Sequence, residues 1–349
     1  MMFLSAASIA VTLVAAGQDG LTTAPLRADL RQVAARRTLT LSQGGVVVGQ
    51  GVLISSTGLA IAPGEAAFGY NGAPRRSLSA SQVGKRDMAV KVESYDAVTD
   101  LALIRVPGLA GGDAKFAQLA SRFDSSVVMV ALHSGPARAQ MARRGLTGVV
   151  GLGKRYMPLN EIRLEAGATA LTGSPVFSAD GKLVGILMAQ LNDEIGTRDM
   201  PEAEVAPKAF GGSAGPARSF GPMPSATAFS LDLPVLDRVI EGFLSEKHQV
   251  THPWIGLFFK TSPSGGAEVT RVIGESPAEA AGIKVGEVIT SAGAQSFDSH
   301  IDFAAYLFSQ KVGASCDLQI RWGTSARKVR VKIAKDTGSG HQLRRVIED

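Results

Sequence analysis

The chain has 349 residues and a single cysteine, Cys316. One cysteine excludes a framework of intrachain disulfides and any zinc site that needs several thiolates. The five histidines include no pair at the spacing of metal ligands. Residues 151–153, Gly-Leu-Gly, are not followed by the strand and helix of a phosphate-binding loop. The sequence therefore predicts neither a metal nor a nucleotide cofactor.

Aromatic residues are scarce, with 14 Phe, 4 Tyr and 2 Trp, whereas glycine is abundant at 40 residues. This balance is typical of folds built from short strands and tight turns. The 45% hydrophobic content suits globular packing, and the length allows two or three domains with cores of their own. We therefore expect a mostly β protein of more than one domain.

The charge is positive but dispersed. Lys and Arg number 36 against 31 Asp and Glu, which gives a net charge of +5. The basic residues occur in short pairs that are not interleaved with aromatic residues, as a single-strand binder would require. We interpret them as a solvated surface and predict no nucleic-acid partner.

Long apolar runs are absent after the first residues. Residues 1–16 are uncharged and apolar, and they end in Val14, Ala15 and Ala16. Small residues at that point are typical of a secretory signal peptide with its cleavage site, so we predict an exported protein. The alternative is an uncleaved membrane anchor, because the stretch is close to the shortest length that spans a bilayer.

The pattern along the chain predicts several units. Residues 17–37 form an amphipathic lead-in, and residues 38–245 contain two sets of short β-branched runs, which predict two packed β-barrels. Asp180-Gly181 predicts a hairpin in the second set. Residues 193–225 have little periodicity and predict a long loop. Residues 234–244 predict a helix with proline in its first turn.

Residues 253–335 have the pattern of a separate α+β unit, and residues 336–349 form a tail. Ser276-Pro277 is a helix N-cap followed by proline at the first helical position, and Gly282 is a helix stop. A helix over 301–308 and a final hairpin over 318–333 complete the unit. In its order of elements, this run resembles a bacterial PDZ domain.

Three segments of residues 38–245 carry a second resemblance. They are 49–54 (Gly-Gln-Gly-Val-Leu-Ile), 96–103 (Asp-Ala-Val-Thr-Asp-Leu-Ala-Leu) and 171–176 (Leu-Thr-Gly-Ser-Pro-Val). In that order they resemble the His, Asp and Ser segments of the trypsin-like domain of HtrA/Deg serine proteases, which also carry C-terminal PDZ domains. The resemblance implies a trypsin-like double β-barrel followed by a PDZ domain, in a catalytically degenerate member of the family.

The degeneracy lies in the residues that occupy the catalytic positions. Aligned with the family pattern, Asp100 takes the acid position, but Glu65 takes the histidine position and Thr172 the serine position. Ala170 and Leu171 replace Gly and Asn in the turn that forms the oxyanion hole. Since that turn needs an unusual backbone, these replacements count against a working oxyanion hole.

This set of residues predicts weak hydrolysis at most. A threonine hydroxyl can act as a nucleophile when a base lies beside it. A carboxylate near its reference pKa of about 4.3, however, is a poor base for an alcohol and a poor acid for an amine. If Glu65 and Asp100 faced each other, their repulsion would raise one pKa, and the pair could share a proton instead of activating Thr172.

The PDZ-like unit keeps the features that peptide binding needs. By resemblance, residues Trp254, Ile255, Gly256 and Leu257 form the loop that binds a terminal carboxylate, and Phe258 begins the edge strand to which a peptide adds. Phe303, Tyr306 and Leu307 are candidates for the pocket wall, with an ordinary core position as the alternative for each.

We therefore expect an exported HtrA/Deg-like pseudoprotease of the periplasm or cell envelope, which binds C-terminal or extended peptides of envelope proteins through its PDZ domain. One alternative is an active endopeptidase with a rearranged site on Thr172. Another is a chaperone-like holder of misfolded proteins. Membrane anchoring follows if residues 1–16 are retained, and the oligomeric state stays open.

Overall fold

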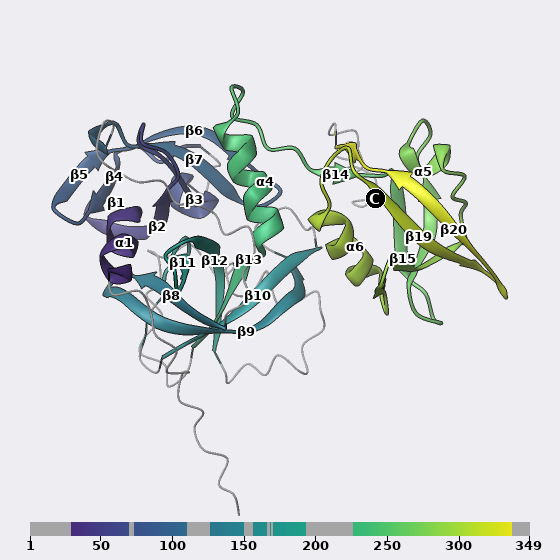
Figure 1. Cartoon of the computed structure of the whole chain (residues 1–349). Coiled ribbons are helices and arrows are strands. Elements are labelled where there is room, and N and C mark those ends of the chain that lie inside the picture. Colours follow the sequence, from purple (N-terminus) through teal and green to yellow (C-terminus); the bar gives the residue numbers. More distant parts are fainter. Residues whose placement is uncertain are drawn as a thin grey trace, which may run out of the picture.

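A computed structural model describes residues 29–69, 73–109, 126–149, 156–165, 168, 170–192 and 226–336. Two β-rich units lie side by side, and a third unit lies beyond them at the end of a connecting segment (Figure 1). The predicted signal peptide, the predicted loop over 193–225 and nearly all of the tail fall outside the described residues. The predicted domain limits are not tested and stay predictions.

The first unit is a seven-stranded antiparallel sheet in the order β5-β4-β1-β2-β3-β7-β6. Strands β5 and β6 are its two edges, so this predicted barrel is an open sheet within the described residues. Helix α1 (Leu30–Arg37) precedes it, and Leu30 and Ala34 are buried on one helix face, as the amphipathic pattern predicts. The strands are β1 (Thr38–Gln43), β2 (Val46–Leu53), β3 (Leu59–Pro63), β4 (Leu78–Gln82), β5 (Lys85–Ala89), β6 (Lys91–Asp96) and β7 (Leu101–Arg105); helix α2 (Gly64–Ala67) follows β3, and the short 3-10 helix η1 (Pro107–Leu109) follows β7.

The second unit is a closed six-stranded barrel in the order β10-β13-β12-β11-β8-β9. Closure removes the exposed strand edges that the first sheet retains. Gly181, with φ +85°, lies in the turn between β11 and β12, so the hairpin predicted from Asp180-Gly181 is confirmed. The strands are β8 (Val127–Leu132), β9 (Gly135–Val149), β10 (Tyr156–Leu164), β11 (Pro175–Ser178), β12 (Leu183–Asn192) and β13 (Ala226–Leu231).

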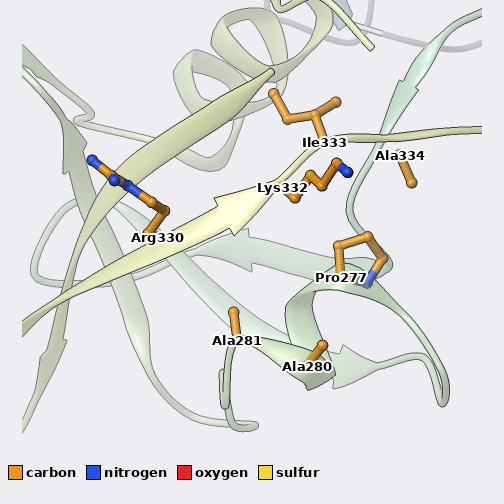
Figure 2. A pocket seen from close by; sticks show the side chains of 7 residues that line it. All are labelled: Pro277, Ala280, Ala281, Arg330, Lys332, Ile333 and Ala334. Carbon is orange, nitrogen blue, oxygen red and sulfur yellow. The ribbon is translucent and has the colours of Figure 1, made fainter. Parts of the chain in front are cut away.

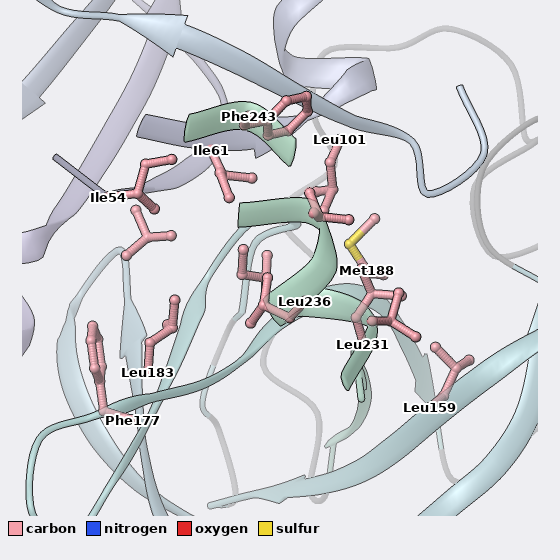
Figure 3. Close-up of a cluster of buried hydrophobic side chains, with 14 of the residues drawn as sticks. Ile54, Ile61, Leu101, Leu159, Phe177, Leu183, Met188, Leu231, Leu236 and Phe243 are labelled. Carbon is pink, nitrogen blue, oxygen red and sulfur yellow. The ribbon is translucent and has the colours of Figure 1, made fainter. Parts of the chain in front are cut away.

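Helix α4 (Leu233–Leu244) joins the two β units through a shared core. Figure 3 shows Leu236 and Phe243 of this helix in one cluster with Ile61 and Leu101 of the first sheet and Leu231 of the barrel. The helix begins with Pro234 in its first turn, so the helix predicted for residues 234–244 is confirmed. Because one apolar cluster contains side chains of both units, neither can move without exposing that core.

The third unit has a sheet in which β15-β16-β17-β19-β20 are neighbours, with β18 paired to β17. Ser276 caps helix α5 by accepting a hydrogen bond from the Glu279 N–H, as predicted. Gly282 follows that helix with φ +70°. The elements are β14 (Pro253–Trp254), β15 (Leu257–Thr261), β16 (Ala267–Val272), α5 (Pro277–Ala280), β17 (Val288–Ala292), β18 (Gln295–Ser296), α6 (His300–Ser309), β19 (Ser315–Trp322), β20 (Ser325–Lys332) and β21 (Ala334–Lys335); β14 pairs with β21.

Helix α6 packs on two sides. Phe303 is fully buried in the core of the third unit, whereas Phe308 belongs to the cluster that α4 shares with the two β units. The Tyr156 ring of β10 meets the His300 ring edge-on, with centroids 5.7 Å apart. The third unit is therefore docked on the barrel through the helix that also flanks its own edge strand.

Candidate functional site

Glu65 lies between the first sheet and the barrel, at the start of helix α2 directly after strand β3 ends. Its carboxylate accepts a hydrogen bond from the Thr172 hydroxyl of the barrel. The Arg75 guanidinium donates through Nη2 to the Glu65 backbone carbonyl over 3.0 Å, which fixes this turn of chain. The structure thus brings together two of the three residues that the sequence assigns to catalytic positions.

The protein around the Glu65 carboxylate raises its pKa, although part of the side chain is exposed. Desolvation is the main cause, and the negative charge of Asp100 adds to it. The hydrogen bond from Thr172 and the positive charge of Arg75 oppose the rise without cancelling it. Glu65 is therefore easier to protonate than an ordinary glutamate.

Asp100 is paired with a different residue. The Tyr95 hydroxyl donates to Asp100 Oδ1 over 2.6 Å. Gly64 permits this contact, since a Cβ at that position would lie 2.1 Å from Asp100 Oδ1. The pKa of Asp100 is raised, mainly by burial, against the opposing effect of the Tyr95 hydrogen bond.

The site therefore contains two separate hydrogen-bonded pairs, Glu65 with Thr172 and Asp100 with Tyr95. In a trypsin-type site, one imidazole bonds both the acid and the nucleophile and transfers the proton between them. Among the hydrogen bonds of the described residues, none joins Glu65 to Asp100. From the sequence we considered that Glu65 and Asp100 share a proton. No direct hydrogen bond between their described side chains supports this.

Thr172 is held in a rigid turn between β10 and β11. Gly173 follows with φ +84°, and a Cβ there would lie 1.9 Å from the Gln50 carbonyl oxygen. The Thr172 carbonyl accepts from the Gln50 N–H over 2.9 Å, and the Gly173 N–H donates to the Leu187 carbonyl over 2.8 Å. Only glycine fits at position 173, because both the backbone angle and the space exclude a side chain.

Ser174 is buried and structural. Its hydroxyl accepts from the Leu171 N–H over 3.2 Å and donates to the Gln50 side-chain oxygen of the first sheet. Ala170 and Leu171, the oxyanion-turn positions, are 3% and 8% exposed and pack inward. Ser174 cannot replace Thr172 as a nucleophile, because solvent does not reach it and its hydroxyl is already bonded on both sides.

A buried polar contact that sequence reasoning missed lies behind the Asp100 segment. His252 Nε2 lies 2.8 Å from Asp96 Oδ1, and both residues are less than a tenth exposed. The His252 ring stacks on the Phe308 ring, with centroids 5.3 Å apart. The Arg238 guanidinium lies 4.8 Å from the centroid of the Phe308 ring. The contact of His252 with Asp96, 156 positions away, leaves no local signal in the sequence.

Asp96 organises the chain that leads to Asp100. Its carboxylate accepts from the Val98 N–H, the Thr99 N–H and the Thr99 hydroxyl as well as facing His252. Burial alone would raise the pKa of Asp96, but the His252 contact and these hydrogen bonds lower it. The Asp96 loop is thus held by its own hydrogen bonds and by His252, which directly precedes strand β14 of the third unit.

Within the described residues, the remaining histidines are not placed to act as the base of a triad. His133 lies in the turn between β8 and β9 and is exposed. His248 Nδ1 contacts the Phe243 carbonyl at the end of α4. His300 begins α6, where its ring Nδ1 lies 2.6 Å from the Thr261 hydroxyl.

The residues predicted to bind peptide form one continuous edge. Gly256 has φ +84°, and a Cβ there would lie 2.2 Å from the Ser276 Cβ, so this loop requires glycine. Strand β15 pairs only with β16 and is an edge of the sheet within the described residues. The Phe258 ring lies 5.7 Å from the Arg271 guanidinium, and Ile255 is buried in the core.

Helix α6 lies against this edge. The Phe259 ring of β15 contacts Phe303 of the helix, with centroids 5.0 Å apart. Phe303 is fully buried, so it belongs to the core and not to an accessible pocket wall, which corrects that candidate. Tyr306 and Leu307 are only partly buried at the margin of the same core and keep an accessible surface. Residues 306 and 307 lie on the same face of the helix as residue 303, so the difference in burial arises from their position one turn further along the helix.

Within the described residues, no cluster of three or more potential metal ligands occurs. Likewise, no helix of the described part is long and apolar enough to cross a membrane.

Comparison with known proteins agrees with this architecture. Residues 253–333 match the PDZ domain family. Among solved structures, the HtrA-type protease AlgW with decapeptide aligns with a TM-score of 0.57 at 14% identity, covering 88% of this chain and 98% of that chain. The HtrA-type protease AlgW with tripeptide aligns with a TM-score of 0.57 at 15% identity, covering 88% and 96%. No curated protein matches the chain. The chain therefore has the fold of HtrA-type proteases, a trypsin-like domain followed by a C-terminal PDZ domain.

Proposed function

We propose that this protein is an exported HtrA-like pseudoprotease that binds peptides through its PDZ domain and does not hydrolyse them. The observation that carries the proposal is the split of the catalytic positions into the pairs Glu65–Thr172 and Asp100–Tyr95. No group in this arrangement can take a proton from Thr172, return it to a leaving amine and be oriented by Asp100 at the same time.

The electrostatics support the same conclusion. A raised pKa makes Glu65 a stronger base than an ordinary carboxylate, but a threonine hydroxyl still holds its proton far more tightly. The hydrogen bond from Thr172 also occupies the carboxylate in the resting state. The buried Ala170 and Leu171 also count against hydrolysis, because they replace residues of the glycine-rich turn that holds an oxyanion.

Peptide binding is the activity that the preserved parts support. The Gly256 loop, the free edge of β15 and the partly exposed Leu307 supply a carboxylate loop, a strand to extend and an apolar contact. The AlgW structures carry a decapeptide and a tripeptide, which fits the same use of this fold. Export to the periplasm or cell envelope rests on the apolar residues 1–16.

Hydrolysis and binding are tested separately. Purified full-length protein is incubated with casein and with fluorogenic peptides, beside Thr172→Ala as a matched control. We expect equal, background-level turnover from both proteins. Robust cleavage that disappears in Thr172→Ala would favour the rearranged endopeptidase, in which Glu65 acts as the base and Thr172 as the nucleophile.

Binding is measured by fluorescence polarisation with labelled peptides that have free or amidated C-termini. We expect the free carboxylate to bind more tightly, and Gly256→Ala to weaken binding at least tenfold because its Cβ would collide with Ser276. Leu307→Ala serves as a second variant that leaves the loop intact. Binding unchanged in both variants would place the peptide elsewhere on the protein.

A further inference from the structure

Helix α6 has sides with different neighbours. Phe303 faces the core of the PDZ domain, whereas Phe308 faces the cluster shared by α4 and the two β units. His300 and Ala304 lie one turn apart, on the side of the helix between these two directions. Both are only partly buried. This side of α6 therefore looks into the corner between the PDZ domain and the barrel.

Strand β15 borders the same side of the helix. Because side chains alternate along a strand, Leu257, Phe259 and Thr261 point to one face of β15. The Phe259 and His300 ring centroids are 6.4 Å apart, and the Thr261 hydroxyl lies 2.6 Å from His300 Nδ1. The groove between β15 and α6 therefore begins at the Gly256 loop and ends at His300.

The barrel supplies a side chain at this end of the groove. Tyr156 begins β10, and its ring meets the His300 ring edge-on, with centroids 5.7 Å apart and planes at 89°. Docking of the PDZ domain on the barrel does not by itself explain this contact. The docking residue Phe308 is only 5% exposed, whereas Tyr156, His300 and Phe259 all keep accessible surface. Partly exposed rings at the end of a groove are suited to contact a ligand.

We propose that Tyr156, together with His300 and Phe259, forms an aromatic subsite of the peptide groove, so that the barrel takes part in peptide recognition. A peptide with its carboxylate at the Gly256 loop runs antiparallel to β15 and turns alternate side chains toward α6. The peptide residue opposite Thr261 is then about four positions before the carboxylate, and its side chain lies beside His300 and Tyr156. An aromatic side chain at that position can pack against these rings. This inference rests on the proposed peptide binding.

A second hollow of the PDZ domain is separate from this groove. An apolar pocket of about 400 Å³ lies between α5 and β20, and none of its lining residues belongs to β15 or α6. Figure 2 shows Pro277, Ala280 and Ala281 on one side of this pocket, and Arg330 and Lys332 on the other. Lys332 therefore offers a control position within the same domain.

The test uses the full-length protein and fluorescence polarisation of two labelled peptides with free C-termini. The peptides differ only in having Phe or Ala at the fourth position before the carboxylate. We expect the Phe peptide to bind about fivefold more tightly, which is the size of one aromatic contact. Tyr156→Ala should abolish this preference while changing the affinity for the Ala peptide by no more than about twofold. Tyr156→Phe keeps the ring and should keep the preference.

The controls are Lys332→Gln in the pocket and Trp322→Ala at the end of β19, where the indole is 58% exposed. Both should bind the two peptides as the unmodified protein does. Binding that depends on Gly256, but shows no preference for Phe or keeps that preference in Tyr156→Ala, would overturn this inference alone. Tighter binding of both peptides to Tyr156→Ala would mean that the barrel obstructs the groove, which also contradicts a subsite.

Failure of the proposed function has a different signature. No peptide binding at all, or binding that is unchanged in both Gly256→Ala and Leu307→Ala, would overturn the proposed function and this inference with it. Thermal unfolding confirms that every variant is folded.

Discussion

Replacing Asp96 with alanine should destabilise the junction between the PDZ domain and the rest of the chain. The substitution removes the acceptor of hydrogen bonds from Val98 and Thr99 and the partner of His252. It also removes a negative charge that stabilises the Arg238 guanidinium, whose buried Nε and Nη2 atoms have no hydrogen-bond partner among the described residues.

The magnitude follows from breaking a buried charged contact on one side only, which costs about 3–5 kcal/mol. Burial has already lowered the pKa of Arg238 to about 10, which indicates how poorly its environment solvates the charge. The assay is denaturant unfolding followed by far-ultraviolet circular dichroism. Glu268→Ala, which removes an exposed ion pair with Lys260, is the control and should cost about 1 kcal/mol or less.

Acid should produce the same effect in the unmodified protein. The folded-state pKa of Asp96 lies below its ordinary value, so its contribution to stability is present in full above about pH 4. That contribution falls as the pH drops through the lowered pKa, and Asp96→Ala should lack this part of the acid dependence. A double-mutant cycle with His252→Ala completes the test. Costs that add within about 0.5 kcal/mol would refute the idea that the two residues stabilise the junction together.

Three further outcomes follow from single positions. Gly173→Ala should destabilise the barrel by several kcal/mol in denaturant unfolding, because its Cβ would lie 1.9 Å from the Gln50 carbonyl oxygen; a cost below about 1 kcal/mol would mean that the turn can relax. Ser276→Ala should cost about 1 kcal/mol through loss of the α5 cap, whereas Ser325→Ala at the exposed hairpin should cost little. Cys316 should resist thiol reagents at pH 8 until the protein unfolds, since burial raises the pKa of its thiol to about 11; rapid labelling of the folded protein would contradict this.

Local patterns predicted local structure well. The Asp180-Gly181 hairpin, the helix beginning near Pro234 and the Ser276 cap all depend on residues close in sequence, and the structure contains each of them. Glu65 and Thr172 lie together where the aligned segments put them. The hairpin, the helix start and the cap can be predicted from sequence because a few neighbouring residues specify turns and caps.

The side-chain partners within the site were not predictable. Tyr95 precedes Asp100 by five residues, but its hydrogen bond to Asp100 depends on the space left by Gly64 at the start of helix α2. The pairing of His252 with Asp96 requires the PDZ domain to be docked, and docking leaves no periodic signal in either segment. Phe303 and Leu307 lie on the same face of α6, one turn apart, and an amphipathic pattern does not tell which turn is covered more fully by the rest of the domain.

The hydrogen bond between Ser174 and Gln50 opposes conversion of this turn into the glycine-rich turn of a trypsin-type protease. Converting Glu65 and Thr172 to histidine and serine would still leave Ser174 where the protease turn has glycine. Changing Ser174 to glycine would deprive the buried Gln50 side chain and the Leu171 N–H of partners, at about 1–3 kcal/mol for each. The change at Ser174 therefore begins with a loss of stability. Because of this coupling, a glycine-rich protease turn is hard to reach from the present sequence by single substitutions.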